Sequence, residues 1–138
     1  MNPEPTIFVL DSFALMAYLG DEPGCERIEQ VFENANDGLC RLLLCTINLG
    51  EVLYMTERHR GLVKAQQVQG LIESLPIDLV DASRNLVLDA AHIKANHVLS
   101  YADAFLVALA QREGAVVLTG DPELQAVGKI INIEWLPK

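Results

Sequence analysis

The chain has few of the features that mark secreted, zinc-binding or membrane proteins. Its three cysteines, Cys25, Cys40 and Cys45, cannot all pair within one chain, so we expect buried reduced thiols rather than a disulfide framework. No CxxC or HxxxH spacing is present, which argues against a zinc site. No apolar run reaches the length of a membrane span, and the first residues lack the basic region of a secretory signal. These absences predict a cytoplasmic protein with no membrane segment.

Basic residues are also scarce. Ten Lys and Arg stand against 19 Asp and Glu, and the formal net charge is -9. A chain this acidic is not expected to attract a nucleic-acid backbone through its overall charge. Binding to nucleic acid would need a local basic patch, a bound metal ion or a basic partner.

Apolar residues, in contrast, are abundant: they make up 51% of the 138 residues, enough for the core of one domain over residues 1–138. Short apolar runs alternate with segments of helical periodicity, and Thr46 is expected to cap one of these helices. The expected strands cover residues 7–10, 41–45, 77–80, 115–119 and 131–135, the last at an edge. The expected helices cover residues 12–19, 25–36, 46–60, 62–75, 83–96 and 100–113. This alternation predicts an α/β fold, a single three-layer α/β/α sandwich with a central parallel sheet.

Four carboxylates are predicted to meet at one edge of that sheet. Asp11 and Asp121 each follow a strongly apolar strand, where ligands bind in open α/β sheets. Glu51 lies within about two turns of the start of its helix, and Asp103 lies in the first turn of another. Carboxylates brought together repel one another unless a cation compensates them. With no sulfur or imidazole among them, Mg²⁺ or Mn²⁺ is the expected ion.

Each acid also has a purely structural interpretation. Ser100 and Asp103 fit a capping box, and Asp121 before Pro122 fits a helix cap. Glu51 could be a solvated residue on a helix face. Asp11 is the hardest to explain in this way, because a carboxylate directly after a buried strand is costly without a partner. The predicted convergence of all four acids favours a functional site.

The residues around these acids form four motifs in one order along residues 7–135. The motifs are VLDSFAL from Val9, NLGEVLY from Asn48, LSYADA from Leu99 and LTGDP from Leu118. They resemble the four acidic motifs of PIN-domain ribonucleases, in particular the VapC toxins of toxin–antitoxin pairs. The chain departs from the pattern at Leu124, where many members have an aromatic residue.

The resemblance implies a metal-dependent endoribonuclease with Asp11, Glu51, Asp103 and Asp121 as the catalytic and metal-binding acids. Three further residues match positions that usually supply supporting hydroxyl or amide groups in the family: Ser12, Asn48 and Thr119. The resemblance also implies an RNA substrate, a PIN-like domain, a homodimer, and a small antitoxin protein whose segment covers the active site.

One dense basic patch could contact an RNA backbone: Arg58, Arg60 and Lys64. Cations near a helix C-terminus often serve only as partners of the helix dipole. However, Arg58 follows Glu51 by nearly two turns, which places both on one helix face about 10 Å apart.

Other functions find less support. A phosphotransfer domain with Asp11 as nucleophile would need a neighbouring acid where Leu10 and Phe13 stand, and the chain has no Walker or GxGxxG loop. His59, His92 and His97 are predicted on helices, without the pairing that nucleophilic or acid–base chemistry needs. A non-catalytic PIN-fold module that binds RNA or protein remains the alternative, since it would keep the fold without needing the acids.

Overall fold

The structure is a computed structural model, and it describes residues 4–137. The strands are β1 Thr6–Leu10, β2 Cys40–Cys45, β3 Asp78–Val80, β4 Val116–Thr119 and β5 Asn132–Trp135. The helices are α1 Ser12–Leu19, α2 Cys25–Asn36, α3 Thr46–Arg60, α4 Leu62–Ser74, α5 Arg84–Asn96, α6 Tyr101–Glu113 and the 3₁₀ helix η1 Pro122–Val127.

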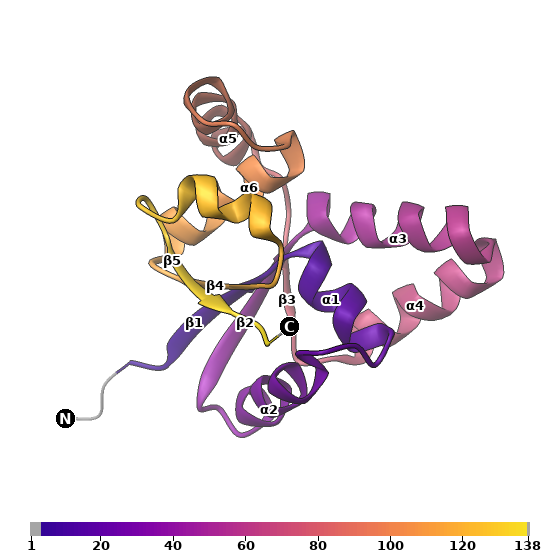
Figure 1. Cartoon of the computed structure of the whole chain (residues 1–138). Helices are drawn as coiled ribbons and strands as arrows, with labels where there is room; N and C mark the ends of the chain where they lie inside the picture. Colours follow the sequence, from indigo (N-terminus) through magenta and orange to yellow (C-terminus); the bar gives the residue numbers. More distant parts are fainter. Residues whose placement is uncertain (1–3, 138) are drawn as a thin grey trace.

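The five strands form one sheet in the order β3-β2-β1-β4-β5. Every neighbouring pair is parallel, so all the strands end at the same edge. The first strand in sequence lies at the centre, between β2 and β4 (Figure 1). The predicted three-layer α/β/α sandwich with a central parallel sheet is therefore confirmed, and β5 is an edge strand as expected.

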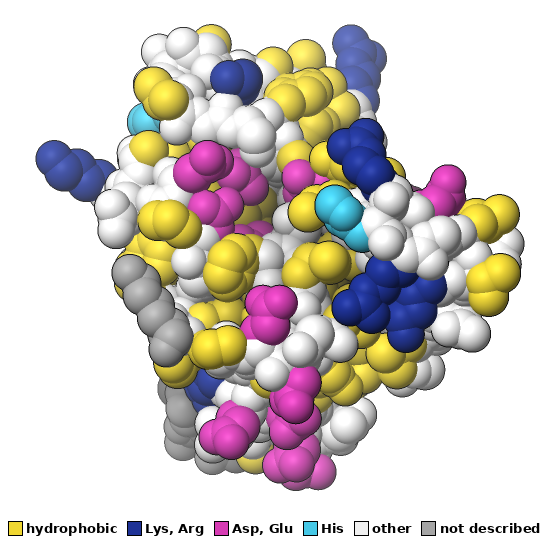
Figure 2. Space-filling view, turned by 45° about the vertical axis from the view of Figure 1, so that its right-hand side comes forward, with side chains coloured by type: hydrophobic (Ala, Val, Ile, Leu, Met, Phe, Trp, Pro, Cys, Tyr) yellow, Lys and Arg dark blue, Asp and Glu magenta, His cyan; other side chains and the backbone are white. Residues whose placement is uncertain are grey.

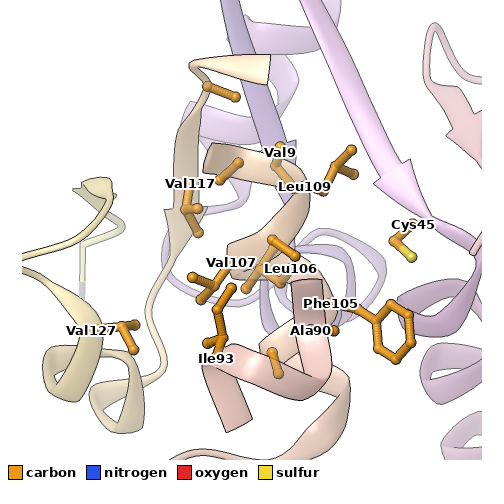
Figure 3. Packing of buried hydrophobic residues seen from close by; sticks show 14 of the residues in the cluster. Val9, Cys45, Ala90, Ile93, Phe105, Leu106, Val107, Leu109, Val117 and Val127 are labelled. Atoms are coloured by element: carbon orange, nitrogen blue, oxygen red, sulfur yellow. The ribbon is translucent and has the colours of Figure 1, made fainter. Parts of the chain in front are cut away.

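Alternate residues of the central strands face two separate apolar cores, as the period of a strand requires. Val9, Leu43 and Val117 pack on one face against α5, α6 and η1, and Figure 3 shows this packing around Leu106 and Leu109 of α6. On the other face, Leu10, Leu42, Leu44 and Leu118 pack among residues of α1, α2, α3 and α4 (Figure 1). Burial of the strands on both faces explains why their sequences read as continuous apolar runs.

Helix α6 is the most deeply buried of the helices. Eight consecutive residues, Asp103–Ala110, are buried, because this helix packs against α5, α3 and three strands. Ser100 caps its first turn, its side chain accepting from the backbone N–H of Asp103 at 3.1 Å. Gly114 ends it in the left-handed conformation with φ 61°. A buried helix that begins with an acid carries that acid to the sheet edge.

The prediction that Thr46 caps α3 is wrong. The helix begins at Thr46, and Cys45 is its cap. The hydroxyl of Thr46 instead accepts from the backbone N–H of Ala82 at 3.2 Å. This bond ties the start of α3 to the segment after β3, a partner 36 residues away that local sequence cannot indicate.

The predictions drawn from missing features can also be compared with the structure. Cys25, Cys40 and Cys45 are all free and buried, as expected. Within residues 4–137, none of the helices combines the length and apolar character needed to cross a membrane.

Candidate metal-binding active site

Asp11 is held at the centre of the carboxyl edge by neutral donors. It follows β1 directly and caps α1, its Oδ1 accepting from the backbone N–H of Ala14 at 2.7 Å. The hydroxyl of Thr119, at the end of the neighbouring β4, donates to Oδ2 of Asp11. Only 2% of Asp11 is exposed. The packing of two central strands therefore fixes this carboxyl group in one orientation.

Asp121 is placed by the turn that follows β4. Its backbone N–H donates to the Thr119 hydroxyl oxygen at 2.9 Å. Its own Oδ1 accepts from the backbone N–H of Glu123 at 3.0 Å, so Asp121 caps η1 with Pro122 at the first position of the turn. The structural interpretation of Asp121 as a cap is correct, and it does not exclude a second role. Thr119 bonds both to Asp11 and to the backbone of Asp121, so it fixes the two acids relative to each other.

Asp103 reaches the same place from the first turn of α6. Oxygen atoms of Asp103, Asp121 and Glu123 lie within 4.8 Å of one another. Opposite ligands of a bound Mg²⁺ are separated by about 4 Å, so this spacing fits a divalent cation. Glu123 was missed by the sequence analysis. Its position two residues after Asp121, on the turn that Pro122 begins, could have indicated that it lies near the other acids.

Glu51 joins the group through α3. The side-chain amide of Asn48 donates to Oε1 of Glu51 at 3.4 Å and to the carbonyl oxygen of Ala102 at 3.3 Å. Asn48 is fully buried, and its Oδ1 has no hydrogen-bond partner within the described residues. Asn48 thus links Glu51 to the residue before Asp103.

The carboxyl groups influence one another's protonation. Burial, the largest cause, raises the pKa of Asp11 to about 7, although the bonds from Thr119 and Ala14 lower it; the charges of Asp103 and Asp121 raise it further. Burial likewise raises the pKa of Asp103 to about 6 against the lowering effect of Ser100. The charges that add to the shift at Asp103 come from three acids, Asp121, Glu51 and Glu123. Five acids are therefore close enough to interact.

Among residues 4–137, none of these acids forms an ion pair with a Lys, Arg or His side chain. The ion pairs found in residues 4–137 join Arg27 to Glu134, Arg41 to Asp78 and Arg112 to Glu113, and none involves the cluster. The group at ligand spacing consists of carboxylate oxygens, and no sulfur or imidazole belongs to it within the described residues. Hard divalent cations prefer such oxygen ligands. The residues present therefore fit Mg²⁺ or Mn²⁺.

The remaining predicted residues are Ser12 and the three basic side chains of α3 and α4. Ser12 is half-buried beside Asp11 as the first residue of α1. Arg58 places its guanidinium group over the ring of Tyr54, 5.3 Å from the ring centroid. Arg60 and Lys64 line a groove of about 110 Å³ together with Met16, Met55 and His59.

The basic side chains do not enter the acidic cluster. Figure 2 shows acidic side chains gathered around a hollow, while Lys and Arg gather separately toward the right of the same view, the side of the α3–α4 hairpin. No histidine belongs to the acidic group within the described residues. His59 and His92 are exposed on helices as predicted, whereas the prediction is wrong for His97, which follows α5. The structure thus brings Asp103 and Asp121, with Glu123, to metal-ligand spacing. Asp11 and Glu51 lie close enough to influence them but outside that group of three.

The PIN-domain family model matches residues 8–130, which spans all four acidic motifs. The chain belongs to the PIN-domain family. The family assignment agrees with the resemblance noted in the motifs. A search of curated protein sequences finds no match to the chain.

Solved structures with the same fold include proteins of toxin–antitoxin systems. VapBC2 of Rickettsia felis, bound to a promoter DNA fragment, superposes with TM-score 0.76 at 13% identity over 95% of this chain and 99% of that one. DNA-bound VapBC of Salmonella typhimurium gives TM-score 0.71 at 23% identity over 94% and 97%. VapC20 of Mycobacterium tuberculosis, described as a sarcin–ricin loop cleaving toxin, gives 0.71 at 20% identity over 89% and 95%. At these identities the likeness shows a shared fold.

Proposed function

We propose that this protein is a divalent-metal-dependent endoribonuclease and the toxin of a toxin–antitoxin pair. The observation that carries the proposal is the acidic cluster: carboxylates from four segments far apart in the chain lie close enough to influence one another's pKa at one sheet edge. Within the described residues, no ion pair compensates them. Such an arrangement is costly for folding alone, because buried carboxylates lose hydration without gaining a charged partner. The cost is understandable if the acids serve to bind a metal ion. We take residues 1–138 as one PIN-like domain.

Asp11, Glu51, Asp103 and Asp121 are the proposed catalytic and metal-binding residues, and Glu123 extends the set. Bound Mg²⁺ or Mn²⁺ would lower the pKa of water and neutralise charge that develops on a phosphodiester. The protein's own contribution is orientation. Thr119 and the Ala14 amide hold Asp11, while Asn48 holds Glu51.

RNA is the proposed substrate, supported by the family and by the description of VapC20 as a toxin that cleaves the sarcin–ricin loop. An acidic pocket repels phosphates unless it holds a cation, and a cation there would bind both the acids and the RNA. Arg58, Arg60 and Lys64 supply positive charge on the α3–α4 hairpin, where we propose that the RNA backbone runs.

We propose a small antitoxin protein as a partner, because the solved neighbours include VapBC assemblies. The uncompensated acids predict that this partner inserts a basic side chain among them. A homodimer in the cytoplasm is also proposed from the resemblance to VapC toxins. Co-expression with the product of the neighbouring gene should inhibit the nuclease, and gel filtration of the protein alone should give a dimer.

The decisive experiment is cleavage of mixed RNA by the purified protein with Mg²⁺, with Mn²⁺ or with EDTA. We expect cleavage that requires the metal and leaves 5′-phosphate and 3′-hydroxyl ends, with an Asp11→Asn preparation as the contamination control. Full activity in EDTA, or 2′,3′-cyclic phosphate ends, would contradict the mechanism. RNA binding without cleavage would instead favour the non-catalytic PIN-fold module.

A further inference from the structure

An aromatic ring lies at the rim of the acidic cluster. Phe13 is in the first turn of α1, two residues after Asp11, and 41% of it is exposed. Its ring rests against Gly120: a Cβ atom added at Gly120 would lie 2.5 Å from Cε1 and 3.0 Å from Cζ of the Phe13 ring. The ring therefore contacts the backbone of the segment that connects Thr119 to Asp121.

Glycine at position 120 is explained by this contact rather than by its backbone conformation. The glycines with positive φ are Gly24, Gly38, Gly61 and Gly114, and Gly120 is not among them. Any residue could adopt the conformation at 120, but a side chain there would occupy the place of the ring. Because Gly120 has no Cβ, the ring packs directly on its backbone. This contact holds the exposed ring between Asp11, after β1, and Asp121, after β4.

Three other aromatic residues are exposed. Trp135 lies on the edge strand β5, and the other two already have side-chain partners. Tyr54 lies under the Arg58 guanidinium group, and Tyr101 packs edge-on against Phe105 at 5.0 Å between ring centroids. Phe13 has no aromatic or cationic partner of this kind within the described residues. An exposed apolar ring is common on protein surfaces, but here it is seated beside carboxylates that would hold a phosphodiester through a metal ion.

We propose that Phe13 is a stacking platform for the nucleobase next to the scissile phosphate. The proposal rests on the proposed nuclease function, since it supplies the nucleotide contact that the acidic cluster lacks. Single-stranded RNA is commonly bound by stacking unpaired bases on aromatic rings, and this contact tolerates any base because every base has a π face. Phe13 would therefore select for an unstacked nucleotide at the cleavage site rather than for its sequence.

The test uses short single-stranded RNAs with one cleavage site, mapped with the wild-type protein, and the same RNAs with an abasic residue on either side of that site. The variants are Phe13→Leu, which keeps an apolar side chain without a π face, Phe13→Trp, which keeps stacking, and Leu39→Ala as a control. Leu39 is a 64% exposed apolar residue that precedes β2 and so lies at the opposite edge of the sheet.

We expect Phe13→Leu to raise KM by about 5-fold to 150-fold, the range for loss of one stacked base, with little change in kcat. Phe13→Trp should retain the wild-type KM, and Leu39→Ala should leave both constants unchanged. On RNA with the abasic residue in the stacked position, wild type and Phe13→Leu should become equal. When 2-aminopurine replaces the base at that position, binding of the wild-type protein should quench its fluorescence, and binding of Phe13→Leu should not.

The outcomes separate the two proposals. RNA cleavage with equal KM for wild type and Phe13→Leu would overturn the stacking platform and leave the nuclease function standing. Quenching of 2-aminopurine that depends on Phe13, without any cleavage, would support the platform and overturn the nuclease function. Absence of any binding to these RNAs would overturn both.

Discussion

Two carboxylates of the sheet, one on the edge strand β5 and one after the central strand β1, have opposite surroundings. Glu134 of the edge strand β5 accepts from Nε and Nη2 of Arg27 at 2.7 and 2.9 Å, a bidentate ion pair with both side chains about one-third exposed. Asp11 of the central region is buried, accepts only from neutral donors, and faces other acids. The first carboxylate is compensated by the protein and connects α2 to β5. The second has no ion-pair partner within residues 4–137.

This difference separates a structural acid from a functional one. A carboxylate that is paired and partly hydrated adds little to stability, and its charge is already neutralised, so it does not attract a further cation. A buried carboxylate held by neutral donors keeps its demand for positive charge, which a metal ion or a partner's basic side chain can satisfy. The contrast predicts that substitutions in the cluster change activity far more than stability, and that substitutions at Arg27 and Glu134 change only stability.

The largest effect is expected for Asp11→Asn. The amide can still accept from Ala14 and bond to Thr119, but it lacks the charge that holds a divalent ion. We expect cleavage to fall by on the order of 10³-fold, since a catalytic metal ion contributes several kcal/mol to transition-state stabilisation. The midpoint of thermal unfolding in EDTA should not fall, because the substitution removes a buried charge.

The histidines provide the control for Asp11→Asn. His92→Ala and His97→Ala should retain most activity, because neither side chain belongs to the cluster. A nuclease that survives Asp11→Asn or Asp103→Asn at the wild-type rate would show that the acids do not carry catalysis.

The second-largest effect is expected in the metal-free protein, whose free energy of unfolding should depend on pH. The folded-state pKa of Asp11 is raised to about 7 and that of Asp103 to about 6, above an ordinary value of 3.8. Between these values the folded state binds more protons than the unfolded state, so stability falls as pH rises. From about pH 5 to about pH 7.5 we expect a loss on the order of 3 kcal/mol in the free energy of unfolding.

Urea unfolding in EDTA measures this loss, and the Asp11→Asn variant is the matched control. The variant should lack most of the dependence, and added Mg²⁺ should stabilise the wild type more at the upper pH, where the acids are ionised. Stability that rises with pH over this range in EDTA would contradict the uncompensated state of the cluster.

The third effect, of intermediate size, is expected at a positioning residue. Thr119→Val keeps a similar shape but removes the hydroxyl that donates to Asp11 and accepts from the Asp121 backbone. Loss of such a supporting bond typically costs 10-fold to 100-fold in metal affinity or activity, so we expect about that loss. Excess Mn²⁺ should rescue part of it, whereas Thr119→Ser should keep near-wild-type activity. An unchanged metal requirement in Thr119→Val would show that Thr119 does not position the acids.

Much of the fold could be predicted because the central strands are buried on both faces. Runs such as Phe8–Leu10 and Val116–Leu118 show no alternation, and the acid that follows each run marks the carboxyl edge. Local sequence could not reveal contacts made across the fold. Thr46 bonds to Ala82, and Glu123 joins the cluster only because the turn after Asp121 points it toward Asp103. The position of Phe13 over Gly120 likewise depends on β1 and β4 being neighbours.

The smallest effect is expected at the compensated carboxylate. Arg27→Gln and Glu134→Gln each remove one partner of a pair whose side chains are 30% and 35% exposed, so solvent screens much of the attraction. Each should lower the free energy of unfolding by about 1 kcal/mol or less, and the double variant should lose no more than the singles, because the two act as one unit. Cleavage should stay at the wild-type rate in all three. If either variant instead lowered activity as much as Thr119→Val, the division between structural and functional acids would fail, since the α2–β5 contact would then also position the cluster.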